Sequence, residues 1–371
     1  MVSPLGTNGC QTGDQVTQMK VLHTVGSLFS YTGGPARSVP GLAGALCKWD
    51  MDVHLWSPQI PENYHPPQGV TLHRGNLDDV ALLPGLDLIH DHGLWLASNH
   101  AVAKAALRRS VPRVVSPRGM LEPWALNHKK WKKKLAWLLY QRGDLRGASA
   151  LHATAKTEAD QFRQLGLKNP IHIIPNGVDV VGLEWGRTWH GTERIALFLS
   201  RMHPKKGLPL LVEAWAEVRP KGWKMRVVGP DEGGHRREVE RMVEAAGLSS
   251  QWEFFDSMDH AEKHKTFASA HLFILPTFSE NFGIVIAEAL ASGIPVITTT
   301  GAPWEELVTR GCGWWVPPEV SLLSEALREA TECPIEHLRE MGQFGKQWME
   351  SAFTWSKIAW EMKNIYEQIA R

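Results

Sequence analysis

Short apolar runs alternate with helical patterns along most of the chain. Runs rich in β-branched residues predict strands, and the apolar residues between them recur with the period of a helix. In the first half, a helix is predicted at 35–47, after a loop that contains glycine. Strands are predicted at 19–25, 52–56, 70–73, 87–90, 113–116, 150–153 and 171–174. This alternation is typical of a mostly parallel sheet whose strands are joined by crossover helices.

The pattern is interrupted once and then begins again. Pro175-Asn176-Gly177 marks a sharp turn, and the polar, irregular stretch 180–193 predicts a linker. Beyond it, strands are predicted at 195–199, 225–228, 252–255, 272–275 and 294–298, and helices at 206–218, 235–246 and 355–369. We therefore expect two α/β domains in tandem, with a cleft between the carboxyl ends of their strands, where such sheets bind ligands.

Length and composition narrow the class of protein. The chain has 371 residues, which suggests two domains. Its 40 basic and 39 acidic residues give a net charge of +1, which argues against a dedicated nucleic-acid-binding protein. The four cysteines lie far apart and form no CxxC pair, which argues against a zinc ribbon and against a disulfide scaffold. We therefore expect the protein to be in the reducing cytosol. The 17 tryptophans against 4 tyrosines suggest contacts with sugar rings or a membrane interface besides core packing.

No targeting or membrane-spanning segment is expected. Residues 1–18, rich in Gly, Thr, Gln and Ser, lack the basic and apolar regions of a signal peptide and predict a disordered leader. The longest apolar candidate, 282–298, is interrupted by Glu288, Gly293 and Pro295. A bilayer span needs an uninterrupted apolar run of about 20 residues, so none is predicted.

The most informative segment is 279–297, which predicts a loop, a helix closed by Gly293, and a strand. Backbone amides at the start of such a helix form an anion site suited to a diphosphate, and Gly283 permits close approach. Glu280 and Glu288 flank this helix start, so both could accept hydrogen bonds from sugar hydroxyls. The alternative is that they belong to a solvated helix face.

This segment resembles the E-x7-E signature of retaining glycosyltransferases of family 4 (group 1), which have the GT-B architecture of two Rossmann-like α/β domains around a cleft. The loop 199–207, with Arg201 and Lys206-Gly207, resembles the R-x4-K-G loop of the same family. The resemblance extends from residue 19 to about 371. It implies an acceptor-binding domain, 19–178 plus a returning C-terminal helix at 352–371, and a nucleotide-sugar-binding domain, 179–351.

The resemblance also implies roles for individual residues. Arg201 and Lys206 would neutralise the donor diphosphate, Arg through its fork geometry and Lys as a point charge. Glu280 would bind donor-sugar hydroxyls and Glu288 the nucleotide ribose. Further donor contacts would come from a set of glycines and backbone amides: Gly33, Gly34, Gly229, Asn281, Phe282, Gly283 and Ile284. The base would lie near Gly229 and the turn 255–258, where this chain has Asp-Ser-Met in place of the family's frequent glycine.

In the first domain, Gly33-Gly34 lies between a strand and a helix and suits either a phosphate contact or a purely structural turn. His90 and His92 form an H-x-H pattern that suggests a metal, but no third ligand of suitable spacing follows. Asp50-Met51-Asp52 mimics a DxD metal motif yet opens a strand, so it predicts a turn. We therefore expect no metal and no cofactor besides the nucleotide-sugar co-substrate. By resemblance, His92 is the active-site histidine.

Residues 115–121 resemble the S-P-R-G-M-L stretch of polysaccharide-assembly members of the family. This implies that Ser116 and Arg118 border the acceptor, with Arg118 able to hold a phosphate on it. Trp95 would stack on an acceptor ring or pack in the core.

The segment 127–142 carries five Lys and one Arg without an acidic residue. Trp131, Leu135, Leu138 and Leu139 share one helical face, while Lys129 and Lys133 lie opposite. Such a basic amphipathic helix suits an anionic membrane surface, and the alternative is a solvated helix with a face in the core.

The expected function is transfer, with retention, of a sugar from GDP-mannose or a UDP-sugar to a hydroxyl of a lipid-linked glycan in bacterial polysaccharide biosynthesis. The location would be the cytoplasm, at the inner face of the plasma membrane. A front-face substitution is favoured, in which the leaving diphosphate helps to deprotonate the acceptor. Two alternatives share the predicted scaffold: a sugar-nucleotide epimerase and a non-catalytic nucleotide-sugar-binding protein.

Overall fold

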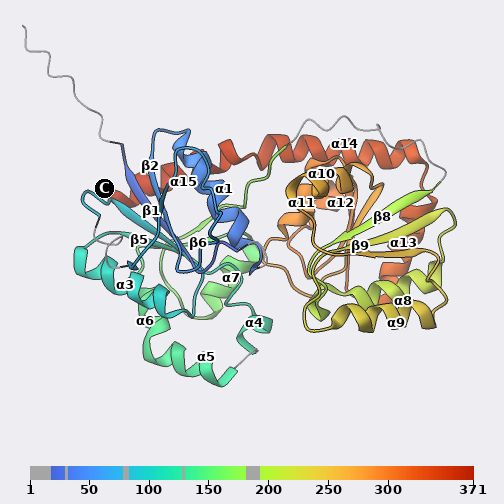
Figure 1. Ribbon diagram of the computed structural model, residues 1–371, viewed down its shortest axis with the longest axis horizontal. Helices are drawn as coiled ribbons and strands as arrows, with labels where there is room; N and C mark the ends of the chain where they lie inside the picture. Colours follow the sequence, from blue (N-terminus) through green and yellow to red (C-terminus); the bar gives the residue numbers. More distant parts are fainter. Residues whose placement is uncertain (1–17, 30–31, 78–82, 128–129, 181–192) are drawn as a thin grey trace, which may run out of the picture.

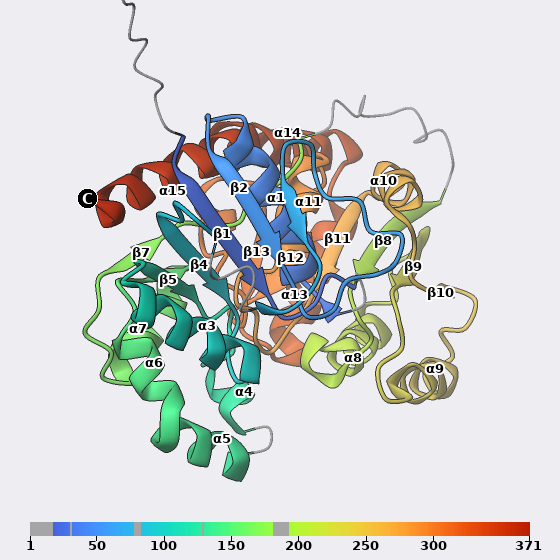
Figure 2. The same ribbon diagram turned by 60° about the vertical axis from the view of Figure 1, so that its left-hand side comes forward.

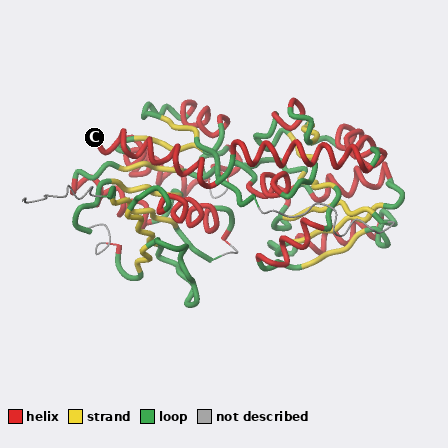
Figure 3. Tube along the Cα trace, turned by 90° about the horizontal axis from the view of Figure 1, so that it is seen from above, coloured by secondary structure: helices red, strands yellow, loops and turns green. Residues whose placement is uncertain are grey.

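A computed structural model describes residues 18–29, 32–77, 83–127, 130–180 and 193–371. The chain forms two α/β lobes that lie side by side (Figure 1). Helices flank the strands of each lobe on both sides (Figure 3). The predicted leader and most of the predicted linker lie outside the described residues.

The first lobe contains a seven-stranded, wholly parallel sheet in the order β3-β2-β1-β4-β5-β6-β7. Its strands are β1 (Lys20–Val25), β2 (Asp52–Trp56), β3 (Thr71–His73), β4 (Leu88–His92), β5 (Arg113–Ser116), β6 (Ala150–Ala153) and β7 (Ile171–Ile173). Its helices are α1 (Pro35–Cys47), α3 (Ala97–Arg109), α4 (Pro123–Asn127), α5 (Lys130–Ala136), α6 (Arg142–Arg146) and α7 (Lys156–Gln164). The central strands are buried on both faces, which explains their nearly continuous apolar runs.

The second lobe contains a six-stranded parallel sheet in the order β10-β9-β8-β11-β12-β13. Its strands are β8 (Arg194–Leu199), β9 (Trp223–Val228), β10 (Trp252–Phe255), β11 (Leu272–Leu275), β12 (Val296–Thr299) and β13 (Gly313–Val316). Its helices are α8 (Leu208–Val218), α9 (His235–Ala245), α10 (His260–Ala268), α11 (Ile284–Ala291), α12 (Glu306–Thr309), α13 (Val320–Glu332) and α14 (Ile335–Ala352). The prediction of two parallel, Rossmann-like sheets is thus confirmed.

Three details differ from the predicted elements. Strand β13 was not predicted, because its two tryptophans stand between glycine and proline signals. The helix expected at 206–218 begins only at Leu208, since Gly207 adopts a left-handed conformation (φ 74°) and ends a short 3₁₀ turn, Pro204–Lys206. The single helix expected at 127–142 is divided into α5 and a π-helical turn, Trp137–Gln141.

The chain crosses between the lobes at two points that lie side by side. The backbone N–H of Val178 donates to the carbonyl of Phe353 at 2.8 Å. Directly afterwards, the Thr354 hydroxyl caps the last helix, α15 (Trp355–Ala370), by accepting from the Lys357 N–H. Helix α14 lies along the second lobe and α15 along the first (Figure 1).

Helix α15 completes the core of the first lobe. Its buried residues Ile358, Met362 and Tyr366 pack in one cluster with strands β1, β2 and β4 and with α1. The apolar side chains of α15 recur at helical spacing, so they form one face of the helix, and this face is buried against the first lobe. The last segment of the chain is structurally part of the first lobe's core.

We predict that Gly177→Ala destabilises the protein at the crossing point. An added Cβ would stand 2.4 Å from the Trp355 ring and 2.9 Å from its Cα, so the ring or the backbone must move. Overpacking of this kind costs about 1–3 kcal/mol. The midpoint of urea unfolding should fall accordingly.

The matched control is Gly143→Ala, because an added Cβ there meets nothing within 4 Å. Ala is the better helix former by up to about 1 kcal/mol, so this variant should unfold at the same or a higher urea concentration. Equal midpoints for both variants would contradict the proposed contact with Trp355.

Candidate active site

The predicted donor loop lies between β11 and α11, at the carboxyl edge of the second sheet. Phe282 anchors it: its ring is buried 5.2 Å from the Trp304 ring, and the Trp304 indole donates to its carbonyl at 2.5 Å. Gly283 then adopts φ 74° and leads directly into α11 at Ile284. The Glu280 N–H is held by the Gly301 carbonyl at 2.7 Å. The loop thus presents its polar side chains from a fixed backbone.

The structure brings Lys206 and Glu280 together from loops 74 residues apart in the sequence. The Lys206 ammonium donates to Glu280 Oε1, and both side chains are largely buried. This contact depends on Gly207, because an added Cβ there would stand 2.0 Å from the Pro276 carbonyl oxygen. A cation and a carboxylate are therefore paired where the family resemblance puts the diphosphate and the donor sugar.

The other residues predicted for the donor lie near this edge but have different partners. Arg201 is half exposed and pairs with Glu232, with 2.7 Å between Nη1 and Oε2. Gly229, at φ 147°, lets the end of β9 approach the Ser200 carbonyl, which an added Cβ would meet at 2.0 Å. Asn281 donates across to the first lobe, to the Thr154 hydroxyl at 2.7 Å. The Cβ positions of Gly33 and Gly34 both face open space, and only Gly33 has a backbone conformation that favours glycine, at φ 110°.

Glu288 faces a cavity between the lobes of about 400 Å³. Its carboxylate accepts from the buried Lys263 ammonium and lies 3.7 Å from Nη1 of Arg37, which belongs to α1 of the first lobe. Burial lowers the pKa of Lys263, and the charge of Glu288 opposes that shift. The carboxylate predicted to bind ribose thus lies in an enclosed, charged setting.

Four buried histidines fill the centre of the first lobe at the ends of β1, β4 and β6. The first hydrogen-bonded chain runs from Tyr366 through His90 and His152 to the Ile174 carbonyl. Since a carbonyl only accepts, His152 must donate through Nε2 and accept from His90, which in turn accepts from the Tyr366 hydroxyl at 2.5 Å. The Ile174 carbonyl therefore sets the tautomers of both histidines, and the Tyr366 hydroxyl of the C-terminal helix completes the chain as a donor.

The second chain is set by Arg118, which can only donate. Its Nη2 lies 3.1 Å from His92 Nδ1, so His92 carries its proton on Nε2 and donates to His23 Nδ1 at 3.1 Å. Both ring nitrogens of His92 are thus engaged, and the side chain is buried. His23 Nε2 is left as a buried donor without a hydrogen-bond partner in the described parts of the chain.

His23, His90 and His92 form the one group of potential metal ligands found in the described residues, with ligand nitrogens within 4.8 Å of one another. The H-x-H pattern indicated His90 and His92. The third histidine, His23, precedes them in the sequence, on β1, whereas a third ligand was expected after them. Arg118 beside His92 makes this a poor setting for a second cation, whereas neutral imidazoles satisfy one another by hydrogen bonds.

Arg118 lies between the histidines and the segment near Val178 where the chain crosses to the second lobe. Its backbone is left-handed (φ 56°), and its Nη1 donates to Asn176 Oδ1 at 2.6 Å. Burial lowers its pKa to about 10, while the charge of Glu158 opposes the shift. Near it, the hydroxyl of Ser116 is buried and has no partner among the described residues. The Arg118 guanidinium forms no ion pair with a carboxylate of the described residues, and such a guanidinium is suited to an anionic ligand.

Trp95 is half-buried and also has a left-handed backbone, at φ 74°. Its indole donates to the Met120 carbonyl at 3.2 Å, and the Lys133 ammonium lies 5.5 Å from its ring centre. The ring is therefore fixed beside the loop that carries Arg118 and near the basic segment.

Helix α5 projects from the first lobe (Figure 2). Large apolar side chains of α5 and of the π-helical turn after it are exposed: Trp131 84% and Leu135 59% in α5, Leu138 68% and Leu139 71% in the turn. Lys129 lies outside the described residues. The alternative of a face packed in the core is wrong for these four side chains, and a surface that mixes lysines with exposed leucines and tryptophan remains.

Comparison with known proteins identifies the family. A model described as "Glycosyl transferases group 1" matches residues 185–348, and one described as "Glycosyl transferase 4-like domain" matches residues 33–177. The chain belongs to the group 1, or family 4, glycosyltransferases. The resemblance seen in 279–297 and 199–207 is thereby confirmed.

Relatives of this glycosyltransferase are distant. A GDP-mannose-dependent monoacylated alpha-(1-6)-phosphatidylinositol monomannoside mannosyltransferase of Corynebacterium glutamicum is 30% identical over 46% of this chain and 46% of its own. The phosphatidyl-myo-inositol mannosyltransferase of Mycobacterium tuberculosis is 29% identical over 53% of this chain and 54% of its own. The matched region thus spans about half the length of these curated relatives.

Solved structures share the fold of this glycosyltransferase. HepE of Anabaena, in complex with UDP and glucose, has a TM-score of 0.77 and 20% identity over 95% of this chain and 100% of its own. The sucrose-phosphate synthase of Thermosynechococcus elongatus has a TM-score of 0.75 and 19% identity over 95% of this chain and 99% of its own. The expected GT-B architecture is confirmed. No helix among the described residues is both long and apolar enough to span a bilayer.

Sequence reasoning missed several residues that contact the candidate site residues. His23, Glu122, His152, Lys263 and Tyr366 reach the site from elements far apart in the chain. Glu122 was the most accessible to inference, because it directly follows the S-P-R-G-M-L stretch. Tyr366 had been indicated only as a packing residue of the last helix.

We predict that stability falls as the pH is lowered from 7 to 5. Burial, with help from the charge of Arg118, lowers the pKa of His23 and of His152 to about 3, and holds those of His90 and His92 well below 6.5. The unfolded chain binds protons below pH 6.5 while the folded chain does not, so each such histidine costs about 2 kcal/mol at pH 5. Urea unfolding at both pH values measures the loss.

His23→Asn keeps an acceptor near the Nδ1 position. It should lower by about one the number of protons taken up on unfolding at pH 5, so the variant should lose less stability between pH 7 and 5 than the parent. The exposed His337→Gln serves as the control and should leave it unchanged. A stability that is flat between pH 7 and 5 would mean that the buried histidines are protonated in the folded state.

Proposed function

We propose that this protein transfers a sugar from a nucleotide-diphosphate sugar, with retention at the anomeric carbon, to a hydroxyl of a lipid-linked glycan in bacterial polysaccharide biosynthesis. The observation that carries the donor part is the pairing of Lys206 with Glu280 beside the start of α11. The name of the GDP-mannose-dependent relative of Corynebacterium glutamicum, and the UDP complexes of HepE, support a donor of the GDP-mannose or UDP-sugar class.

The leaving diphosphate is met by Lys206, by Arg201 after it exchanges Glu232 for phosphate, and by the amides of Gly283 and Ile284. Cations and amides fixed in this way stabilise charge that develops in the transition state, often the largest contribution to catalysis. Glu280, released from Lys206 by the diphosphate, accepts from donor-sugar hydroxyls. Glu288 accepts from the ribose in the cavity that it lines with Lys263.

Substitution occurs on the front face, with the diphosphate helping to deprotonate the acceptor. His92 orients the donor sugar and acceptor only after Arg118 releases its Nδ1. No metal takes part, because diphosphate charge is met by side-chain cations and the group His23, His90 and His92 contains no carboxylate and adjoins Arg118.

The acceptor is bound along the face formed by Trp95, Ser116 and Arg118, with the Arg118 guanidinium on its phosphate. The basic segment 127–142 binds the anionic inner surface of the plasma membrane. Its exposed Trp131 and leucines supply the apolar contact and its lysines the attraction to anionic headgroups. This arrangement brings a lipid-diphosphate glycan to Arg118 without a spanning helix.

We predict that Lys206→Ala lowers the transfer rate about 10²- to 10³-fold, because one fixed charge is lost from the transition state. The measurement is transfer from UDP-glucose and GDP-mannose to polyprenyl-diphosphate-linked sugar, after melting-point screening with UDP and GDP has identified the nucleotide.

Lys156→Ala, which removes an exposed pair with Asp160, is the control and should keep the full rate. Activity should also persist in EDTA. Donor conversion to another nucleotide sugar without acceptor would favour an epimerase, and nucleotide binding without any turnover would favour a binding protein.

We predict that replacing Leu135, Leu138 and Leu139 together by Ser weakens binding to vesicles of phosphatidylglycerol and phosphatidylcholine at least about tenfold, because buried apolar area is lost. Co-sedimentation measures the binding. Leu107→Ser, at an 81% exposed position of α3, is the matched control and should bind like the parent. Equal binding of the triple variant would exclude this surface as the membrane contact.

A further inference from the structure

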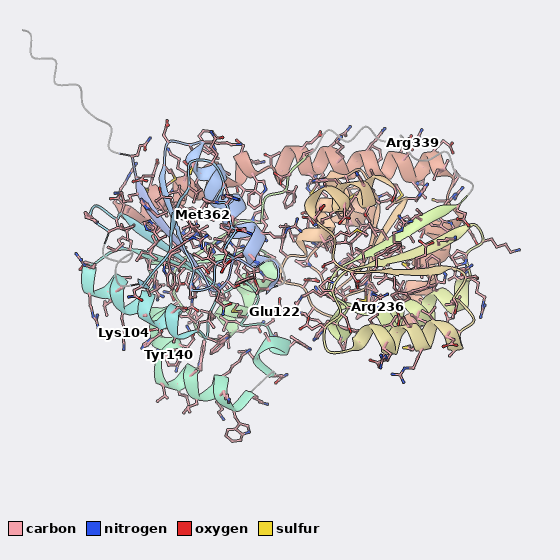
Figure 4. All side chains as sticks on the ribbon, viewed as in Figure 1. Lys104, Glu122, Tyr140, Arg236, Arg339 and Met362 are labelled. Carbon is pink, nitrogen blue, oxygen red and sulfur yellow. The ribbon has the colours of Figure 1, made fainter. Side chains whose placement is uncertain are left out.

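Glu122 is a carboxylate of the first lobe buried against the second. It lies between β5 and α4 on the side that faces the second lobe (Figure 4), and only 4% of the residue is exposed. Its Oε2 accepts from Lys205 Nζ at 3.2 Å and from the Ser279 hydroxyl at 2.5 Å. A buried carboxylate is costly unless partners of this kind compensate it, so the contact depends on the two lobes being together.

Each partner stands one residue from a residue assigned to the donor. Lys205 precedes Lys206, and Ser279 precedes Glu280. The two loops are also joined within the second lobe, because the Lys205 carbonyl accepts from the Phe278 N–H at 2.8 Å. A single carboxylate of the acceptor lobe thus holds both loops that would meet the diphosphate and the sugar.

Neighbouring contacts reinforce this junction. The Lys205 ammonium lies 5.1 Å from the ring centre of Trp124, and the His203 ring stands edge-on to the same indole at 5.4 Å. Gly119 is required for the approach of the lobes, since an added Cβ there would stand 2.8 Å from Cβ of Asn281. The loop with Arg118 therefore packs directly against the donor loop.

The contact of Glu122 with Lys205 also determines which lysine pairs with Glu280. Lys205 and Lys206 are adjacent cations, and the two carboxylates Glu122 and Glu280 take one each. Without Glu122, Lys205 would compete for Glu280 or for the diphosphate, and Ser279 would lose its acceptor.

We propose that Glu122 is a positioning residue that couples closure of the lobes to the arrangement of the donor loops. By holding Lys205 and Ser279, it directs Lys206 alone toward the diphosphate and holds the Arg118 loop against the donor loop. This inference rests on the proposed function for its catalytic consequence but not for its conformational one.

The conformational test needs no substrate. Glu122→Ala removes both acceptors, so small-angle X-ray scattering of the nucleotide-free protein should show a larger radius of gyration than for the parent. Glu122→Gln keeps the shape and one acceptor oxygen and should open less. Asp160→Ala, which removes an exposed carboxylate of the same lobe, is the matched control and should match the parent. An unchanged radius for Glu122→Ala would overturn the proposal.

The kinetic test separates positioning from binding. For both Glu122 variants, the Kd of UDP or GDP should change less than about threefold, because the charged side chains proposed to hold the nucleotide, Arg201, Lys206 and Glu288, belong to the second lobe. The kcat should fall at least about tenfold through lost orientation. In a Lys205→Met background, the loss from Glu122→Gln should be much smaller, because the shared contact is already gone.

Additive losses in the double variant, or a full kcat in Glu122→Ala, would refute the coupling. If the parent protein binds neither UDP nor GDP and transfers nothing, the proposed function fails while the scattering comparison still decides the role of Glu122. A melting point of Glu122→Gln equal to that of the parent separates either outcome from misfolding.

Discussion

The pairing of Lys206 with Glu280 depends on a backbone contact with no chemistry of its own. Gly207 passes so close to the Pro276 carbonyl that no side chain fits, and this brings the end of β8 under the loop that follows β11. The ammonium and the carboxylate then meet with both side chains largely buried, where electrostatic interactions are stronger than in water. This edge of the second lobe is therefore built by backbone proximity, and the pairing of the charges follows from it.

The first lobe is organised around directional hydrogen bonds instead of ion pairs. Two groups fix which imidazole nitrogens carry a proton: Arg118, which can only donate, in one chain, and the Ile174 carbonyl, which can only accept, in the other. Both chains also touch the crossing segment, through Asn176 and the Ile174 carbonyl. Arg118 is thus connected to the segment that crosses between the lobes, as Glu122 connects its own loop to the second lobe.

Local patterns were sufficient for all strands but β13 and for locating the loops that carry Glu280 and Lys206. The strand runs, Gly283 and the Glu280 and Lys206 motifs are all signalled within a few positions, because parallel strands bury both faces and ligand loops follow them. Long-range partners could not be predicted in this way. His23 joins the histidine group from a different strand, and Glu122 has its partners in the other lobe. Leu138 is exposed because no described element packs over it, which its own sequence context does not indicate.

The return of α15 to the first lobe has a consequence for the order of synthesis. Ile358, Met362 and Tyr366 complete a core whose other members come mostly from the first third of the chain. Since a growing chain leaves the ribosome from its N-terminus, the second lobe, which is contiguous, is whole before the first lobe can close. Until then the β1 side of the first sheet keeps an apolar face open, and the lobe made first is the one that finishes folding last.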